Sequence, residues 1–346
     1  MTAFVFTQEE LESDALDPES IDRALIEAGG FFVRLPRRLV VLRRMLSVSR
    51  DFFSLPLEEK AAFGIEHSAH FRGWSEMRNE RDWREQLHLG RECPSTASAI
   101  EAGEMPAFRR LEGPNLWPAD AAWREAVMTY IDVATGLGEL ILSRIAGLLR
   151  VDPTSFGNTK SDGYLVAKII AYHPQTSEQA LRSGVAAHVD FSWLTINLQD
   201  SVGLEVRRPD GRWGPVDVLS DAVWVHVGEL LEHATAGRYL ATPHRVLNPS
   251  AETTRLSIPV FVNPPLDGIV PVFTAAAAHD SLSPHDRLRG ESEEHIHRVL
   301  SRRSGYRPFT FGPAEWRRKG KGVWCCACCP SPPEDLSEPH SPRSSG

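Results

Sequence analysis

Two histidines and one aspartate are the residues of this chain best suited to chemistry. His188 and Asp190 lie two positions apart in the strand-like segment GVAAHVDFSWLTINLQD, and His244 follows in ATPHRVLN. Residues i and i+2 of a strand point to the same side, so the first pair is predicted to share one strand face. Two imidazoles and one carboxylate on one side of Fe(II) leave its other side open to O₂ and an organic molecule. We therefore expect His188, Asp190 and His244 to bind a catalytic iron.

Arg255 and Ser257 form a second candidate pair, again two positions apart, in the run RLSIPVFV. A guanidinium can hold a carboxylate through two parallel hydrogen bonds, and a hydroxyl on the same face adds a third. The alternative role for Arg255, a surface salt bridge, contributes little to stability and does not fit an alternating apolar run. We expect this pair to bind the carboxylate of a small molecule.

Short runs of β-type residues surround both sets. From Gly163 onward, Gly, Pro, Asn or Asp bound the segments YLVAKIIAYH, HVDFSWLTINL, GLEVRR, AVWVHVG, HRVLN and RLSIPVFVN. Asp210-Gly211 between LEVRRP and RWGPV predicts a hairpin. Many short strands in series indicate a sandwich or a barrel.

Helical patterns precede this region. Asp17-Pro18 is typical of a helix start and Gly29-Gly30 of a helix end, with a short strand expected directly afterwards in FFVRLP. A second amphipathic helix is predicted in RRLVVLRRMLSVSRDFFSL, ending before Pro56. Residues 64–118 have an irregular, charge-rich pattern and are expected to wrap over the rest of the protein.

The longest helical pattern runs from Ala119 to Arg150, with apolar residues recurring every three or four positions. A buried supporting helix without a chemical role is expected there. Gly136 and Gly138 are predicted to mark a bend or a close packing point.

These patterns divide the chain into five regions. We expect an N-terminal region of helices and covering loops, a long supporting helix, a β-rich catalytic core, a C-terminal helical segment and a disordered tail, at residues 1–118, 119–160, 161–275, 276–320 and 321–346.

The composition is that of an ordinary globular protein. Hydrophobic residues make up 42% of the chain and charged residues 24%, and the net charge is −8. The negative charge argues against a nucleic-acid partner or an acidic membrane surface. We read no signal peptide and no membrane span, and expect a cytoplasmic monomer or weak homo-oligomer acting on a small molecule.

The cysteines support a reducing compartment, because only Cys93 lies in the body of the chain. The other four crowd into WCCACCP, where adjacent cysteines are poorly spaced for one zinc ion. The Pro- and Ser-rich sequence that follows predicts a disordered tail without catalytic function, with soft-metal binding or thiol modification as the alternatives.

In order and spacing, H-x-D, H-R-V and R-x-S resemble the Fe(II)/2-oxoglutarate-dependent oxygenases of the isopenicillin N synthase-like family. Residues 163–264 resemble the double-stranded β-helix (jelly-roll, cupin-like) core of that family. The upstream segments AGGFFVRL, FFSLPLEEK, RGW, REQLHLG and GPNLWP resemble its N-terminal region in the same order, so the likeness covers about residues 17–310.

The resemblance implies a mainly β fold with α additions, and Fe(II), 2-oxoglutarate and O₂ as cofactor and co-substrates. His188, Asp190 and His244 would be the iron ligands, whereas Arg255, Ser257 and Tyr172 would hold the distal carboxylate of 2-oxoglutarate. Phe191 and Trp193 flank the metal segment and are expected either as walls of the substrate pocket or as core residues. The expected reaction is hydroxylation of a small molecule, with specialised metabolism as its expected context.

Some positions depart from the family pattern. His226 and Glu229 stand where the family usually has Asn and Asp, and Ser192 and Trp193 replace a frequent glycine-containing pair. His226 is a conceivable alternative ligand, but His244 has the family's H-R-V context, so we expect His226 to support the site rather than bind the metal.

Three other functions remain open at this point. One is an isopenicillin N synthase-like oxidase or cyclase, in which R-x-S holds a substrate carboxylate and no 2-oxoglutarate is used. The second is an ethylene-forming-like reaction. The third is a non-catalytic cupin-like binding module, which the intact ligand set argues against. Nucleotide-binding loops and the G-x-S-x-G hydrolase motif are absent from the sequence.

Overall fold

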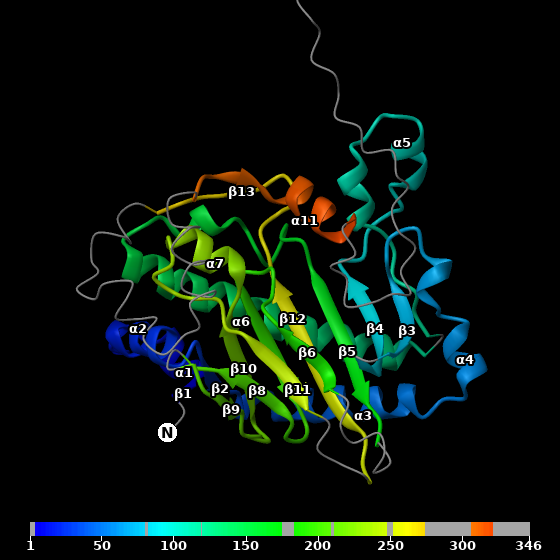
Figure 1. The fold of residues 1–346 in the computed structure, drawn as a ribbon, viewed down its shortest axis with the longest axis horizontal. Helices are drawn as coiled ribbons and strands as arrows, with labels where there is room; N and C mark the ends of the chain where they lie inside the picture. Colours follow the sequence, from blue (N-terminus) through cyan, green and yellow to red (C-terminus); the bar gives the residue numbers. More distant parts are fainter. Residues whose placement is uncertain are drawn as a thin grey trace, which may run out of the picture.

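A computed structural model describes residues 4–79, 82–118, 120–174, 183–208, 211–247, 252–273 and 306–320. Its centre is a pair of facing β-sheets (Figure 1). The larger sheet has the strand order β1 (Val5–Thr7), β2 (Gly30–Arg34), β10 (Ala222–Val227), β7 (Leu194–Gln199), β12 (Arg255–Val262), β5 (Val166–Tyr172), β4 (Trp83–Gly90) and β3 (Gly73–Arg78). The smaller sheet has the order β6 (Ser183–His188), β11 (His244–Leu247), β8 (Leu204–Arg207) and β9 (Trp213–Pro215).

The two sheets enclose a core of their own, as expected for the double-stranded β-helix. Alternate residues of the larger sheet, among them Ile170 and Trp224, pack with Val206 and Val246 from the smaller sheet. The other face of the larger sheet packs into a second and larger core under the helices. Strand β7 lies in the middle of the larger sheet, and both of its faces are covered. Because successive side chains of a strand point to opposite faces, Leu194, Ile196 and Leu198 face the helices, whereas Thr195, Asn197 and Gln199 face the smaller sheet.

The helices lie outside this sandwich and at one end of it. They are α1 (Gln8–Glu12), α2 (Pro18–Glu27), α3 (Leu39–Phe53), α4 (Leu57–Ala61), α5 (Ala97–Glu101), α6 (Ala121–Leu149), α7 (Glu229–Ala234) and α11 (Phe311–Gly320). Short 3₁₀ helices occur at Pro36–Arg38, Ile65–His67, Ala107–Leu111 and Pro153–Phe156, and a small two-stranded sheet joins β13 (Ile269–Val270) to β14 (Phe309–Thr310). In Figure 1, α5, α7, α11 and β13 gather at the end of the sandwich where β10 stops.

The predicted first helix is confirmed as α2. The Asp17 carboxylate accepts a hydrogen bond from the Glu19 amide, and Pro18 occupies the first helical position. Gly29 then takes φ +68°, a left-handed conformation that glycine adopts without strain. The chain can therefore turn directly into β2.

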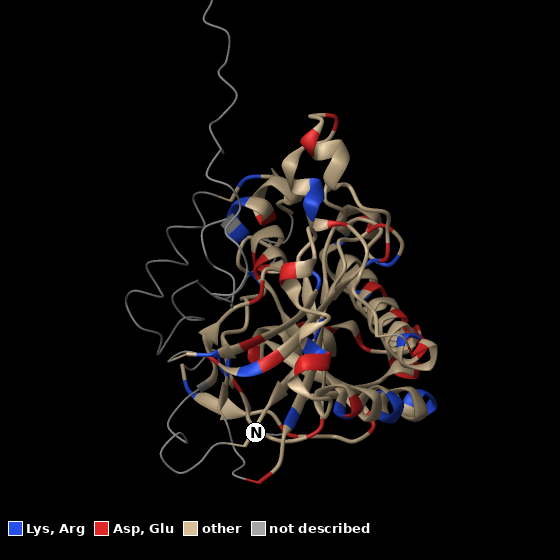
Figure 2. Ribbon diagram, turned by 90° about the vertical axis from the view of Figure 1, so that its right-hand side faces the viewer, with Lys and Arg blue, Asp and Glu red and all other residues tan. Residues whose placement is uncertain are grey.

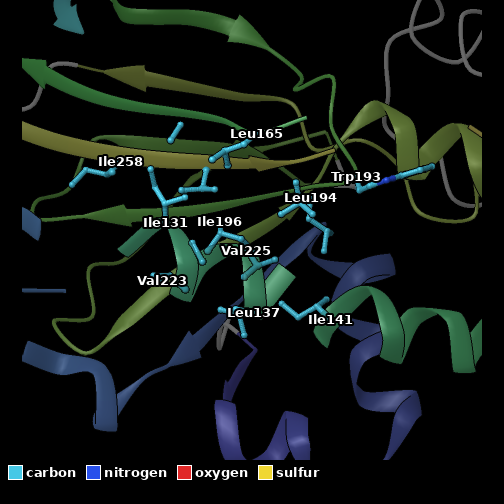
Figure 3. Close-up of a cluster of buried hydrophobic side chains, with 14 of the residues drawn as sticks. Ile131, Leu137, Ile141, Leu165, Trp193, Leu194, Ile196, Val223, Val225 and Ile258 are labelled. Carbon is cyan, nitrogen blue, oxygen red and sulfur yellow. The ribbon is translucent and has the colours of Figure 1, made fainter. Parts of the chain in front are cut away.

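The long central helix α6 lies against the larger sheet. Ile131, Leu137 and Ile141 project from it toward strand residues such as Ile196 and Val225 (Figure 3). A Cβ on Gly138 would lie 2.5 Å from Val262 Cγ2. Of the two alternatives predicted for this position, a bend or a close packing point, the structure shows the close packing point. By length and hydropathy α6 could also span a membrane, but half of its most apolar window is buried here, as in the core helix of a globular protein.

Residues 64–118 are not simply irregular, which corrects the sequence expectation. They contain β3 and β4, which extend the larger sheet from β5. Leu87 and Leu89 of β4 enter the helix-side core, whereas Gln86 and His88 alternate with them on the inner face. This period-two pattern was hidden by the charged residues on both sides of it.

The hairpin expected around Asp210-Gly211 is present, since β8 and β9 pair in antiparallel fashion with Arg207 opposite Trp213. Asp210 itself lies outside the described residues. Of the expected C-terminal helical segment, 276–320, the structure describes β14 and α11, and the expected tail at 321–346 lies outside the described part.

Candidate active site

The three predicted metal ligands come together at one end of the sandwich. One nitrogen or oxygen atom from each of His188, Asp190 and His244 lies within 4.8 Å of the others. His188 is the last residue of β6, and His244 is the first residue of its partner strand β11, directly opposite. Asp190 lies just beyond the end of β6, not on the strand, so the expected shared strand face is replaced by a bend toward β7.

Both imidazoles are oriented by the backbone. The Nδ1 atom of His188 lies 2.9 Å from the Ala186 carbonyl oxygen, and Nδ1 of His244 lies 3.0 Å from that of Thr242. Because a carbonyl can only accept, each Nδ1 carries the proton and donates it. The lone pair of each Nε2 is therefore available to a metal, which is the usual arrangement of metal-binding histidines.

Asp190 is held through one oxygen. Its Oδ2 accepts hydrogen bonds from the Thr195 hydroxyl at 2.7 Å and from His226 Nε2 at 2.9 Å, while Oδ1 lies 3.6 Å from Nε2 of His188. Burial alone would raise the pKa of Asp190, but the imidazoles of His244, His226 and His188 hold it well below its ordinary value. The carboxylate is thus ionised and able to bind a cation.

His244 has the complementary property. Burial lowers the pKa of His244 to about 3, although the nearby Asp190 carboxylate acts in the opposite direction. The imidazole therefore stays neutral near pH 7, which is the form that binds metal.

Arg255 projects from β12 into the space between the sheets, where it is only 1% exposed. Its Nη2 donates to Gln199 Oε1 at 2.7 Å, and its Nε donates to the carbonyls of Ser201 and Val202. The guanidinium lies 5.1 Å from the centre of the Tyr172 ring. Nη1 is buried without a hydrogen-bond partner among the described residues. A buried donor of this kind fits a carboxylate that is supplied by a ligand.

Ser257 shares this inner face, and its hydroxyl donates to Asn197 Oδ1 at 2.9 Å. One strand thus supports three residues of the site: β7 presents Thr195 to Asp190, Asn197 to Ser257 and Gln199 to Arg255. Sequence reasoning missed these three supports. The alternation of polar and apolar residues in LTINLQ was the available signal, although nothing in it names the partners.

The two residues expected near the substrate differ in position. Phe191 follows Asp190, is partly buried, and stacks on Phe311 with 5.8 Å between ring centres, while the Arg318 guanidinium lies 5.1 Å from its ring centre. Trp193 is instead fully buried in the helix-side core, where its Nε1 donates to the Phe156 carbonyl (Figure 3). The core alternative therefore holds for Trp193.

The unusual residues of the VHVGE segment also contact the metal segment. His226 hydrogen-bonds the carboxylate of Asp190, and the backbone amide of Glu229 donates to the Asp190 carbonyl at 2.7 Å. His226 thus supports a ligand in the arrangement observed.

Comparisons with known proteins agree with this geometry. Residues 162–264 match the 2OG-Fe(II) oxygenase superfamily, and residues 11–120 match the family described as non-haem dioxygenase in morphine synthesis N-terminal. The 2-oxoglutarate-Fe(II) type oxidoreductase hxnY of Emericella nidulans is 32% identical over 258 residues, which cover 69% of this chain and 72% of hxnY. A homoarginine-6-hydroxylase of Arabidopsis thaliana is 29% identical over 66% of this chain and 65% of its own length.

A solved structure shows the same fold. The full-length Neurospora crassa T7H in complex with alpha-KG superposes with a TM-score of 0.69 at 20% identity, covering 91% of this chain and 95% of that one. The chain belongs to the 2OG-Fe(II) oxygenase superfamily. It is a non-haem iron, 2-oxoglutarate-dependent dioxygenase that oxidises a small molecule with O₂.

Proposed function

We propose that this dioxygenase hydroxylates a C–H bond of its substrate. Relatives support hydroxylation as the outcome, since several carry the name homoarginine-6-hydroxylase. We assign Fe(II) binding to His188, Asp190 and His244. We assign the distal carboxylate of 2-oxoglutarate to Arg255, Ser257 and Tyr172, and a wall of the substrate pocket to Phe191.

The buried Nη1 of Arg255, which lacks a partner in the described chain, is the observation that carries the co-substrate assignment. Gln199 and two backbone carbonyls fix the other guanidinium nitrogens, so Nη1 is already aimed when the ligand arrives. Iron and 2-oxoglutarate supply the oxidising chemistry when bound, with succinate as the co-product. The protein residues hold, orient and desolvate the reactants.

Anaerobic titration of Fe(II) with and without 2-oxoglutarate tests the assignment. Wild type should develop the weak visible metal-to-ligand band when both are present. Arg255→Gln should keep Fe(II) binding but need much more 2-oxoglutarate for the same band. The control Arg34→Gln makes the same substitution at an exposed arginine and should behave as wild type. An unchanged 2-oxoglutarate requirement in Arg255→Gln would contradict the anchor.

The reaction type is tested by succinate release, screened against amino acids, small peptides and related carboxylates. A hydroxylated product gains one oxygen atom in mass, whereas desaturation or ring closure removes two hydrogens. Succinate release coupled only to loss of hydrogen would contradict hydroxylation.

We further propose that the protein works in the cytoplasm as a monomer or weak homo-oligomer, without a nucleic-acid or membrane partner. The net charge of −8 and the free thiol of Cys93 support this proposal. Lys and Arg are also interspersed with Asp and Glu over the ribbon in Figure 2. Light scattering after size exclusion and sedimentation with anionic vesicles test it, and stable tetramers or vesicle binding would contradict it.

A further inference from the structure

His226 is a buried imidazole whose one side-chain hydrogen bond among the described residues is to the Asp190 carboxylate. It lies on β10 directly opposite Thr195 of β7 and is 2% exposed. Its Nε2 donates to Oδ2 of Asp190 at 2.9 Å, and the described chain supplies no hydrogen-bond partner for its Nδ1. Its ring centre lies 4.6 Å from that of the metal ligand His244.

A purely structural role does not explain this residue. Leaving a buried polar atom unpartnered costs about 1–3 kcal/mol, so an apolar side chain of similar size would suit the packing better. The hydrogen bond to an ionised carboxylate is the compensating interaction, because bonds to charged groups are stronger than neutral ones.

The two donors on Asp190 act on the same atom. Thr195 and His226 both reach Oδ2, at 2.7 and 2.9 Å, and they approach it from neighbouring strands. Both oxygens face ligand nitrogens, since Oδ1 lies 3.6 Å from Nε2 of His188 and Oδ2 lies 3.7 Å from Nε2 of His244. With Oδ2 already accepting two hydrogen bonds, Oδ1 has the greater free acceptor capacity. The carboxylate is held in one rotation before any metal arrives.

We infer that His226 is a positioning residue that, together with Thr195, fixes the Asp190 carboxylate through Oδ2 and thereby sets the affinity for Fe(II). This inference rests on the proposed role of Asp190 as a metal ligand. The inferred role is support of Asp190. Direct binding of the metal by His226 is the alternative that its proximity to His244 would otherwise suggest.

The test compares His226→Leu with His226→Gln in metal-free protein under anaerobic conditions. Leu removes the donor, whereas the side-chain amide of Gln can place an N–H near the position of Nε2. Fe(II) affinity, measured by competition with a chromophoric chelator, should fall about 10- to 100-fold in His226→Leu, as for other groups that support metal ligands. His226→Gln should recover most of the loss.

Controls separate this effect from a general loss of structure. His67→Leu makes the same change at an exposed histidine and should bind Fe(II) as wild type does. The thermal midpoint of each metal-free variant shows whether it is folded. If His226→Leu does not fold, His226→Phe keeps the ring volume and tests the same donor.

Wild-type affinity in a folded Leu or Phe variant would overturn the inference, and so would a Gln variant as weak as Leu. A wild-type protein that binds no Fe(II) would instead overturn the proposed metal site. The two failures are therefore distinguishable.

Discussion

Short hydrogen bonds orient the side chains of the proposed metal ligands, and a single substitution can remove a ligand. His188 is the most accessible of the three, with a side chain that is 37% exposed, and its one described hydrogen bond is to the backbone. His188→Ala should therefore abolish Fe(II) binding and turnover while changing the free energy of unfolding of the metal-free protein by less than about 1 kcal/mol. Fe(II) titration and thermal unfolding measure the two effects, and retained turnover would contradict the ligand assignment.

Glu85 illustrates a second buried charge, on the helix-side face of β4. Lys60, His173 and Trp74 all hydrogen-bond its carboxylate. Burial alone would raise the pKa of Glu85, but hydrogen bonds from His173, Lys60 and Trp74 lower it to about 2, against an ordinary value of 4.5. Because the folded-state pKa is depressed, the ionised carboxylate stabilises the fold above about pH 4.5, and this contribution is lost as the pH falls toward 2.

Glu85→Gln should consequently lower the free energy of unfolding by about 3 kcal/mol near pH 7. The difference from wild type should shrink as the pH falls from 4.5 to 2, because wild type then loses the same charge. Denaturant unfolding at several pH values measures it. The exposed control Glu58→Gln should show no such convergence, and a pH-independent difference at Glu85 would contradict the charge argument.

Residue type and spacing were enough to single out His188, Asp190 and His244, which the fold brings into one cluster, and Arg255 and Ser257, which both contact β7 on the inner face. They did not reveal Thr195, and although they predicted a supporting role for His226 they did not identify Asp190 as its partner, because a polar residue in a buried strand acquires its partner only when the strands pair. The position of Asp190 beyond β6 was likewise hidden, since H-x-D on a strand and H-x-D at a strand end look alike in sequence.

At the scale of elements, the fit between α6 and the larger sheet depends on a glycine. Gly138 faces Val262 of β12, and a methyl group there would lie 2.5 Å from Val262 Cγ2. Gly147 of the same helix is exposed, and a Cβ there would meet nothing within 4 Å. The two positions therefore separate helix propensity from packing.

Gly147→Ala should stabilise the protein by up to about 1 kcal/mol, the usual difference in helix propensity. Gly138→Ala gains the same propensity but must displace a packed valine, so it should destabilise by about 1–3 kcal/mol. Chemical denaturation of both variants measures the opposite signs. If Gly138→Ala stabilised the protein as much as Gly147→Ala, the close packing would be contradicted.

Elements were predictable where one periodicity dominated. The apolar spacing in α6 and the caps of α2 gave these helices nearly to the residue. β3 and β4 were missed because their inner residues, such as Gln86 and His88, are polar and line the interior between the sheets. A strand with buried polar residues thus lacks the apolar signal that marks a core strand.

At the scale of the whole molecule, the site joins segments that are distant in sequence and that belong to both sheets. His188 and His244 lie on the smaller sheet, whereas Arg255 and Ser257 lie on the larger one. Fe(II) and 2-oxoglutarate bound at these residues would connect the two sheets, and this connection exists only in the folded state. Ligand binding and global stability should therefore be linked.

Fe(II) and 2-oxoglutarate added anaerobically at about 100 times their dissociation constants should each stabilise the native state by about 3 kcal/mol, and so raise the thermal midpoint by a few degrees. Chelation of the metal should reverse both increments, because in the proposed site the iron would contribute to 2-oxoglutarate binding as well as Arg255. His188→Ala should show neither increment, and Arg255→Gln should keep the first and lose most of the second. Equal 2-oxoglutarate increments in wild type and Arg255→Gln would show that the larger sheet does not hold the co-substrate.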